Sequence, residues 1–384
     1  MVKYTSLVAP SKYVQGRGIM AEAGALTKPL GKKVLFIRDS VVARLVGEVL
    51  NSSFGQAGLE SVAVDFEGEC SKKEIARITD IARSEQADVV AGVGGGKVID
   101  AAKAVARPLG KAVVIIPTIA ATDAPTSSLS VIYTEEGIFE EYQFFDRNPD
   151  LVLVDTEVIA RAPARFLVGG MGDALATWFE AEASARAYKQ AISGGLPTMT
   201  ALQLARLCYE TLIEYGLSAK LAVERQALTP AVEKVIEANT LLSGLGFESG
   251  GLAAAHSIHN GLTVLEATHH FYHGEKVAFG TISQLLLEER STGEVEEVVD
   301  FCISVGLPVT LEELGIGKAS REDLFRVAKA ACAPGETIHN MPFEVQPEMV
   351  LDAMLAADAL GATKKRDRGF TSSLPVPHRK RVDS

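Results

Sequence analysis

Five of the seven histidines in this 384-residue sequence fall within 18 positions. They are His256, His259, His269, His270 and His273. Histidine is the commonest metal ligand and titrates near neutral pH, so the cluster indicates a metal site or an acid–base site. His256 and His259 are three positions apart on an expected helix at 251–262, and His273 begins another helical run. No pair has the HExxH spacing, which disfavours a zincin-type protease.

A carboxylate could complete such a site. Asp173 follows Gly169-Gly170-Met171-Gly172, at what reads as a junction between glycines and a helix. The alternative is structural, because aspartate is a favoured N-cap of helices. Spacing alone does not choose Asp173 over Glu248 or Glu275.

A glycine-rich turn indicates a phosphate site. The apolar run Val89–Val93 leads into Gly94-Gly95-Gly96-Lys97, and a helix is expected from Val98. Glycines allow a ligand close to the backbone, and a helix N-terminus presents N–H groups to an anion. The turn is not a Walker A loop, because Val98 replaces the metal-binding Ser or Thr, and Lys97 breaks the GxGxxG pattern. The alternative is a tight turn with a solvated lysine.

Asp39 ends the apolar run that starts at Val34. A carboxylate at the end of such a strand is placed to bind ribose hydroxyls and to repel a 2′-phosphate, which favours NAD over NADP. The neighbouring Arg38 weakens that preference. An N-cap role for Asp39 in the next helix is an equal alternative.

A third candidate segment, 117–127, follows the strand Val113–Ile116 and is rich in Thr, Ser and Asp. Loops at the carboxyl ends of parallel strands commonly hold ligands, so its hydroxyls could contact phosphates or a nicotinamide amide. Turn chemistry is the alternative, including an Asx-turn at Asp123.

The elements that must carry these residues alternate in the first half of the chain. Apolar, β-branched runs predict strands, and three- and four-residue periodicity predicts helices between them. This alternation predicts a parallel sheet with helices on both faces. The expected strands are 34–37, 62–64, 89–93, 113–116 and 151–154, and the expected helices are 41–50, 72–83 and 98–106.

The second half has no comparable strand signal, so we expect it to be all-helical, with helices at 201–215, 231–242, 276–289 and 349–360. The predicted domains are an α/β domain at 1–163, a helical domain at 164–363 and a basic, disordered tail at 364–384.

Composition narrows the class of protein. The 38 basic and 49 acidic residues give a net charge of −11, which disfavours nucleic acid as a partner. No apolar run is long enough to cross a membrane, and no signal peptide is recognised at the N-terminus. The four cysteines are scattered, so we expect neither a disulfide framework nor a cysteine zinc site. A cytoplasmic enzyme fits best.

Together these motifs resemble the iron-containing alcohol dehydrogenase superfamily, and within it the glycerol dehydrogenases. The resemblance rests on the segments 94–100, 117–127, 172–176, 246–261, 273–276 and 335–340 in their order, and it spans about nine-tenths of the chain. It implies a Rossmann-like NAD domain and a helical metal domain, the dehydroquinate synthase-like fold, with the active site between the two.

The resemblance also implies residue roles. Asp173, His256 and His273 match divalent-metal ligands, with zinc the metal in glycerol dehydrogenases and Fe²⁺ or another divalent metal as the alternative. Asp123 matches a carboxylate that faces the substrate. The matching NAD contacts are Asp39, Gly94, Gly95, Gly96, Lys97, Val98, Ile99, Asp100, Thr118, Ile119, Ala120, Ala121, Ser127, Leu129 and Tyr133. Similar enzymes are homo-octamers that oxidise polyols such as glycerol and 1,2-propanediol, and dihydroxyacetone is the product from glycerol.

Other functions remain open. A sister enzyme of the same superfamily, such as a glycerol-1-phosphate dehydrogenase or a dehydroquinate synthase-like lyase, would need cationic side chains near the histidines, where the sequence offers Lys276. A non-redox metallohydrolase would not bind NADH. A purely structural protein would have no use for the histidine cluster and the glycine turn.

Overall fold

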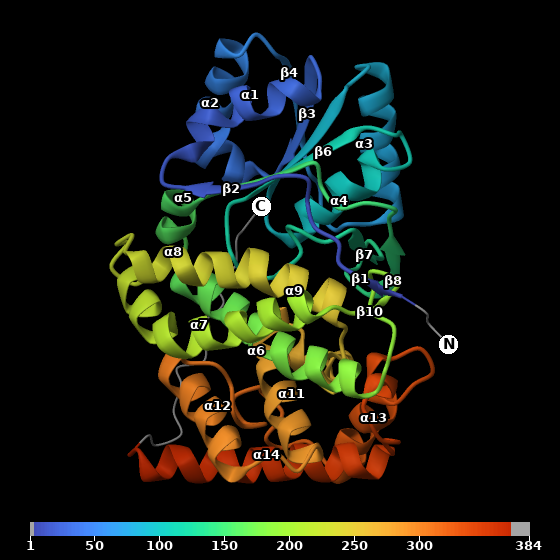
Figure 1. The fold of residues 1–384 in the computed structure, drawn as a ribbon, viewed down its shortest axis with the longest axis vertical. Coiled ribbons are helices and arrows are strands. Elements are labelled where there is room, and N and C mark those ends of the chain that lie inside the picture. The colour runs from blue at the N-terminus through green and yellow to red at the C-terminus, as the bar shows by residue number, and fades with distance from the viewer. Residues whose placement is uncertain (1–3, 370–384) are drawn as a thin grey trace.

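A six-stranded parallel sheet forms the upper part of the molecule in the computed structural model, which describes residues 4–369 (Figure 1). All neighbouring strands of this sheet run parallel, as the sequence predicts. In spatial order the strands are β2 (Tyr13–Gly16), β9 (Leu151–Asp155), β6 (Ala112–Pro117), β5 (Val89–Gly94), β3 (Lys33–Arg38) and β4 (Glu60–Asp65).

Helices cover both faces of the sheet, because the buried strand residues alternate between two apolar clusters. On one face, Phe36 of β3 packs with Val46 and Leu50 of the next helix, and on the other Leu35 packs with Ile78 and Ile99. The helices of this part are α1 (Ala23–Thr27), α2 (Ser40–Gln56), α3 (Lys72–Ser84), α4 (Gly96–Ala106) and α5 (Thr156–Arg161).

The register of the strands brings the predicted cofactor segments to one edge. Arg38 pairs with Val93 across β3 and β5, and Gly94 pairs with Pro117 across β5 and β6. Asp39, the glycine turn and the loop after Pro117 therefore leave the sheet side by side. Ligands of open α/β sheets bind at this carboxyl edge.

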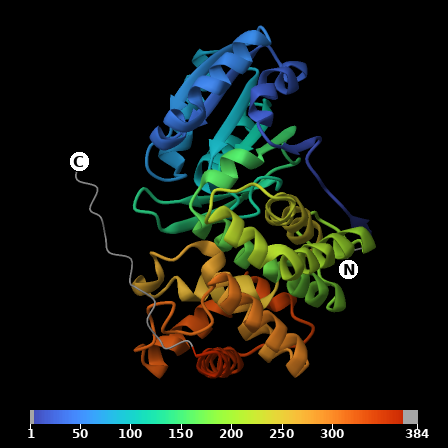
Figure 2. The same cartoon turned by 90° about the vertical axis from the view of Figure 1, so that its left-hand side faces the viewer.

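The rest of the chain forms a helical body below the sheet, with α14 across its base (Figures 1 and 2). One apolar cluster continues from the sheet into this body. Its helices are α6 (Ala164–Arg186), α7 (Met199–Val223), α8 (Pro230–Glu237), α9 (Ser243–Gly250), α10 (Ala254–Leu262), α11 (His273–Leu287), α12 (Thr292–Val305), α13 (Arg321–Ala331) and α14 (Pro347–Asp367). None of the helices described is both long and apolar enough to span a membrane.

The helix expected at 231–242 is the first part of a longer helical segment. The prediction at 231–242 covers α8 and a π-helical turn, η3 (Ala238–Leu242), after which the chain continues directly into α9. π-turns are rare and often lie at functional sites. Here the turn faces the loop after β6, because the side-chain amide of Asn239 donates to the carbonyl of Ala120.

Several strands differ from the sequence analysis. The second half is not purely helical, because β10 (Leu196–Pro197) pairs in parallel with β1 (Thr5–Ser6). An antiparallel hairpin, β7 (Leu129–Tyr133) and β8 (Phe139–Phe144), was not predicted, and neither was the edge strand β2. The expected strand at 62–64 is part of the longer β4.

The predicted tail also begins too early. Residues Lys364 to Asp367 continue α14. Basic side chains at this end form ion pairs with carboxylates that are distant in the sequence. Lys364 pairs with Glu296 at 3.0 Å, and Arg368, just beyond the helix, pairs with Asp300 at 2.9 Å. Residues 370–384, which include His378, lie outside the described residues.

Glycines hold α6 and α11 in backbone contact. A Cβ atom at Gly274 would lie 1.8 Å from the carbonyl oxygen of Gly169, and one at Gly172 would lie 2.3 Å from the carbonyl oxygen of Gly274. No other residue type fits there, because real Cβ contacts do not approach so closely. A similar contact joins α10 to α11, where a Cβ at Gly280 would lie 2.4 Å from the carbonyl oxygen of Ala255.

We expect Gly274→Ala to lower the free energy of unfolding by about 1–3 kcal/mol, because the added methyl group forces α6 and α11 apart. Gly293→Ala is the matched control: Gly293 is likewise the second residue of a helix, α12, but nothing lies within 4 Å of its Cβ position. The control should be neutral or slightly stabilising. Chemical denaturation of both variants measures the difference, and equal stabilities would contradict the packing argument.

Candidate active site

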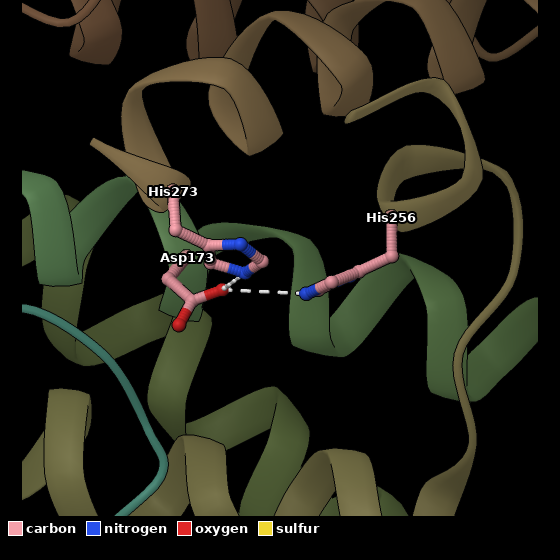
Figure 3. Close-up of side chains that lie close together, drawn as sticks. All are labelled: Asp173, His256 and His273. Atoms are coloured by element: carbon pink, nitrogen blue, oxygen red, sulfur yellow. Dashed lines mark ion pairs between the residues drawn. The ribbon is translucent and has the colours of Figure 1, made fainter. Parts of the chain in front are cut away.

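Asp173, His256 and His273 converge from three helices (Figure 3). Asp173 lies on α6, His256 on α10, and His273 is the first residue of α11. Oδ1 of Asp173 is 3.0 Å from Nε2 of His273 and 3.3 Å from Nε2 of His256. The three potential ligand atoms lie within 4.8 Å of one another. The structure thus brings together the three side chains that the sequence analysis singled out as metal ligands.

These residues fit a divalent metal. Asp173 is only 1% exposed, and its Oδ1 has no hydrogen-bond partner although two imidazole nitrogens approach it. A buried carboxylate oxygen without a donor requires an explanation, and a bound cation supplies one. Two imidazole nitrogens and one carboxylate oxygen are a donor set that zinc and iron both accept.

The alternative role of Asp173 as an N-cap is wrong. Asp173 lies well inside α6, which begins at Ala164, so its carboxylate is not needed to satisfy a helix terminus. The run of glycines before it does not mark a junction. It marks the part of α6 that packs closely against α11 at Gly169 and Gly172 and against the loop after β6 at Gly170.

The charged groups around the site shift one another's pKa values. Burial alone would raise the pKa of Asp173, but His273 and His256 outweigh it and hold the pKa well below its usual range. Burial lowers the pKa of His256, yet the carboxylates of Glu180 and Asp173 raise it well above its usual value. The low pKa keeps the Asp173 carboxylate ionised, which is the form that binds a cation.

Glu180 supports His256 from behind, and the sequence analysis missed it. Its Oε2 lies 2.5 Å from Nδ1 of His256, and its Oε1 accepts hydrogen bonds from the backbone N–H groups of His256 and Ala253. This contact leaves Nε2 of His256 facing Asp173. Glu180 follows Asp173 by two helical turns, and that spacing is the signal that could have identified it.

The other three histidines of the cluster divide into two groups. His259 is buried, and its Nε2 lies 3.1 Å from Nδ1 of His273, so it supports the ring behind the site. Burial, with the positive charges of His273 and Lys276, holds the pKa of His259 well below its usual value. His269 and His270 are exposed on the loop before α11 and do not join the group.

Asp123 reaches the site from the loop after β6. Its backbone N–H donates to Oδ2 of Asp173 at 3.3 Å, and its own Oδ2 accepts a hydrogen bond from Ser243 at 2.8 Å. Burial and the nearby charge of Asp173 raise the pKa of Asp123 well above its usual range. The carboxylate expected to face a substrate thus lies beside the candidate metal ligands.

The glycine turn lies at the start of α4, as predicted. β5 ends at Gly94, Gly95 is the N-cap of α4, and Gly94 has a positive φ of 154° that suits glycine. The first N–H groups of a helix have no partner within it, so this turn can bind an anion. Lys97 is exposed and pairs with Glu69 at 2.5 Å.

The loop after β6 connects this turn to the histidine group. The N–H of Thr118 donates to the carbonyl of Gly94, and the side chain of Ile119 lies over Gly95. Farther along, the carbonyls of Ala120 and Ala121 approach α6 at Gly170 and Gly169. A short segment therefore joins a candidate phosphate site to a candidate metal site.

Several predicted cofactor residues have side chains that are buried or bonded to other residues of the chain. Val98 and Ile99 are buried in the apolar core, so α4 offers a ligand only their backbone. Asp100 is buried and pairs with Lys103 at 2.9 Å. The hydroxyl of Ser127 donates to the carbonyl of Ala124.

Leu129 and Tyr133 lie on β7. The carbonyl of Leu129 accepts a hydrogen bond from Lys103, and both side chains are partly buried. Asp39 is the N-cap of α2, because its Oδ1 accepts from the N–H groups of Val41 and Val42 at 2.8 Å. A role for each of these three residues in NAD binding stays a prediction.

We expect Glu180→Gln to weaken metal binding by about 10- to 100-fold, because loss of the carboxylate frees the His256 ring. Glu210→Gln is the control, since Glu210 is exposed and contacts only Arg206 nearby. Competition with a chromogenic chelator measures the affinity. An unchanged affinity in Glu180→Gln would show that Glu180 does not orient the ligand.

Comparisons with known proteins identify the family of the chain. The family model for iron-containing alcohol dehydrogenase matches residues 10–156. A glycerol dehydrogenase from Thermotoga maritima is 54% identical over 362 residues, covering 94% of this chain and 99% of the relative. A glycolaldehyde reductase from Halobacterium salinarum is also 54% identical over 360 residues, covering 94% and 98% of the two chains.

Solved structures extend the comparison. The crystal structure of glycerol dehydrogenase from Schizosaccharomyces pombe matches 98% of this chain and 96% of its own, with a TM-score of 0.94 and 40% identity. A 1,3-propanediol oxidoreductase shares the fold at 18% identity, with a TM-score of 0.75. The chain belongs to the iron-containing alcohol dehydrogenase family.

Proposed function

We propose that this chain is a zinc-dependent glycerol dehydrogenase that transfers hydride from glycerol or a related vicinal diol to NAD. The observation that carries the proposal is the buried Oδ1 of Asp173, which has no hydrogen-bond partner and faces the imidazoles of His256 and His273. The glycine turn supports the redox assignment, because the loop after Pro117 connects it to the same site.

Different residues would bind the metal, the cofactor and the substrate. Asp173, His256 and His273 would hold the metal, and the first N–H groups of α4 would bind the pyrophosphate of NAD. A divalent metal in such a site acts as a Lewis acid on an alcohol, and NAD accepts hydride. Asp123 accepts a hydrogen bond from a second substrate hydroxyl and so orients the carbon that loses hydride toward the nicotinamide.

The reaction balances without another reactant. The secondary C–H bond of glycerol gives hydride to NAD, and the hydroxyl gives up a proton as the C=O bond forms. The products are dihydroxyacetone, NADH and one proton. 1,2-Propanediol has the same pair of adjacent hydroxyls and should react in the same way.

Two similar proteins bear on the substrate. One is named a glycerol dehydrogenase and one a glycolaldehyde reductase, at equal identity. Glycerol and glycolaldehyde both carry oxygens on adjacent carbons, which is the feature that a metal and Asp123 would recognise together. A phosphate-bearing substrate has less support, because Lys276, the cation that the sequence offers for it, is buried and burial lowers its pKa.

The choice of zinc rests on three protein ligands, which leave a position open for substrate as in catalytic zinc sites. Two histidines and a carboxylate also bind Fe²⁺. We propose zinc as the working metal, a cytoplasmic location and a homo-octamer. Elemental analysis of the purified protein tests the identity of the metal. Its mass by light scattering tests the homo-octamer.

We expect NADH to form when the protein is mixed with NAD and glycerol, and the near-ultraviolet absorbance of NADH measures it. EDTA should abolish the reaction by removing the metal, and zinc should restore it. Activity without any bound metal would contradict the proposal. Activity restored by Fe²⁺ and not by zinc would correct the metal alone.

We expect Asp39→Asn to raise the KM for NAD by about tenfold and to leave the KM for glycerol unchanged, because a ribose contact to a charged group is lost. Asparagine caps helices as well as aspartate, so α2 should remain intact. Asp39→Ala removes both functions and serves as the comparison. If Asp39→Asn binds NAD normally and Asp39→Ala is destabilised, Asp39 is only a helix cap.

A further inference from the structure

Two buried hydroxyl groups link the candidate substrate carboxylate to α6. The hydroxyl of Ser243, the first residue of α9, donates to Oδ2 of Asp123 at 2.8 Å. Oγ1 of Thr177 lies 2.8 Å from Oγ of Ser243, and both side chains are fully buried. Thr177 follows Asp173 by one helical turn, so α6 carries both this hydroxyl and a candidate metal ligand on one face.

The ionised form of Asp123, which is the form that accepts from a substrate hydroxyl, fixes the direction of these hydrogen bonds. A serine hydroxyl has a single proton, and an ionised carboxylate only accepts. Ser243 therefore gives its proton to Asp123 and must accept from Thr177. Thr177 thus fixes the rotation of the Ser243 hydroxyl.

Close packing keeps the two hydroxyls in place. A Cβ at Gly244 would lie 1.9 Å from Oγ1 of Thr126, so α9 is pressed against the loop that carries Asp123. A Cβ at Gly246 would lie 2.5 Å from the methyl carbon of Thr177, so α9 is also pressed against α6. This packing holds the backbones that carry the two hydroxyls at a fixed separation.

The arrangement leaves one oxygen of Asp123 for a ligand. Ser243 occupies Oδ2, whereas Oδ1 has no hydrogen-bond partner among residues 4–369 and is not fully buried. The carboxylate is held at one oxygen and open at the other. Its backbone N–H contacts Asp173, so Asp123 as a residue lies beside the candidate metal ligands.

We propose that Ser243, oriented by Thr177, is a positioning residue that makes Asp123 select substrates with a second hydroxyl group. This inference rests on the proposed function, because it concerns how a diol is recognised. A substrate with one hydroxyl does not need Asp123 and should be indifferent to Ser243. A diol should lose the contact when the carboxylate is free to turn.

The test compares propane-1,2-diol with propan-2-ol, which share a secondary alcohol carbon and differ by one hydroxyl. We expect Ser243→Ala to lower kcat/KM for the diol by about 10- to 100-fold, the effect of losing a hydrogen bond to a charged group. The value for propan-2-ol should change by less than about twofold. Thr177→Val should give a smaller loss of diol preference, and Thr177→Ser, which keeps the hydroxyl, should restore it.

Two controls separate positioning from general damage. Ser283→Ala removes another buried serine hydroxyl, on α11, that donates only to the carbonyl of Phe279, and it should keep the diol preference. Metal content should be unchanged in Ser243→Ala, and both serine variants should remain folded at the temperature of the assay. The double variant Ser243→Ala/Asp123→Asn should be no worse than Asp123→Asn alone, because both changes remove the same contact.

Several results would overturn the inference. Equal losses on both alcohols, loss of metal in Ser243→Ala, additive losses in the double variant, or the same change in Ser283→Ala would each assign Ser243 a general structural role. These outcomes differ from failure of the proposed function. In that case the wild-type protein itself would form no NADH with any diol, and the inference would fall with the proposed function.

Discussion

The backbone contact between α6 and α11 is the constraint on which the site depends. Gly169, Gly172 and Gly274 allow two helices to approach more closely than side chains permit. That approach places Asp173, the residue after Gly172, against His273, the residue before Gly274. The glycines therefore set the spacing of two of the three candidate metal ligands.

The rest of the site is built outward from α6. Glu180, two turns after Asp173, holds His256 by its ring and its backbone N–H. Thr177, one turn after Asp173, reaches Ser243 and through it Asp123. A single helix thus supplies a candidate metal ligand, the support for another and the support for the carboxylate that would face the substrate. Such shared scaffolding keeps groups at fixed distances, which catalysis requires.

Much of the fold could be predicted because buried parallel strands such as β5 and β6 read as continuous apolar runs. The hairpin strand β8 could not, since nearly all of its residues are exposed and no apolar run marks it. The end of α14 reads as a basic tail because the partner of Lys364 is Glu296, distant in sequence. The histidine cluster indicated a metal site, but local sequence could not distinguish Asp173 from other carboxylates. Glu180 and Ser243 went unpredicted because their partners lie on other elements.

The proposed function requires Asp173, His256 and His273 to hold one divalent metal together. Anomalous X-ray diffraction from crystals of the purified, metal-loaded protein, recorded above and below the zinc absorption edge, tests it most directly. We expect one strong peak bonded to Oδ1 of Asp173 and to Nε2 of both histidines. A peak bonded elsewhere, or a metal-loaded active enzyme with no peak between these three side chains, would contradict it.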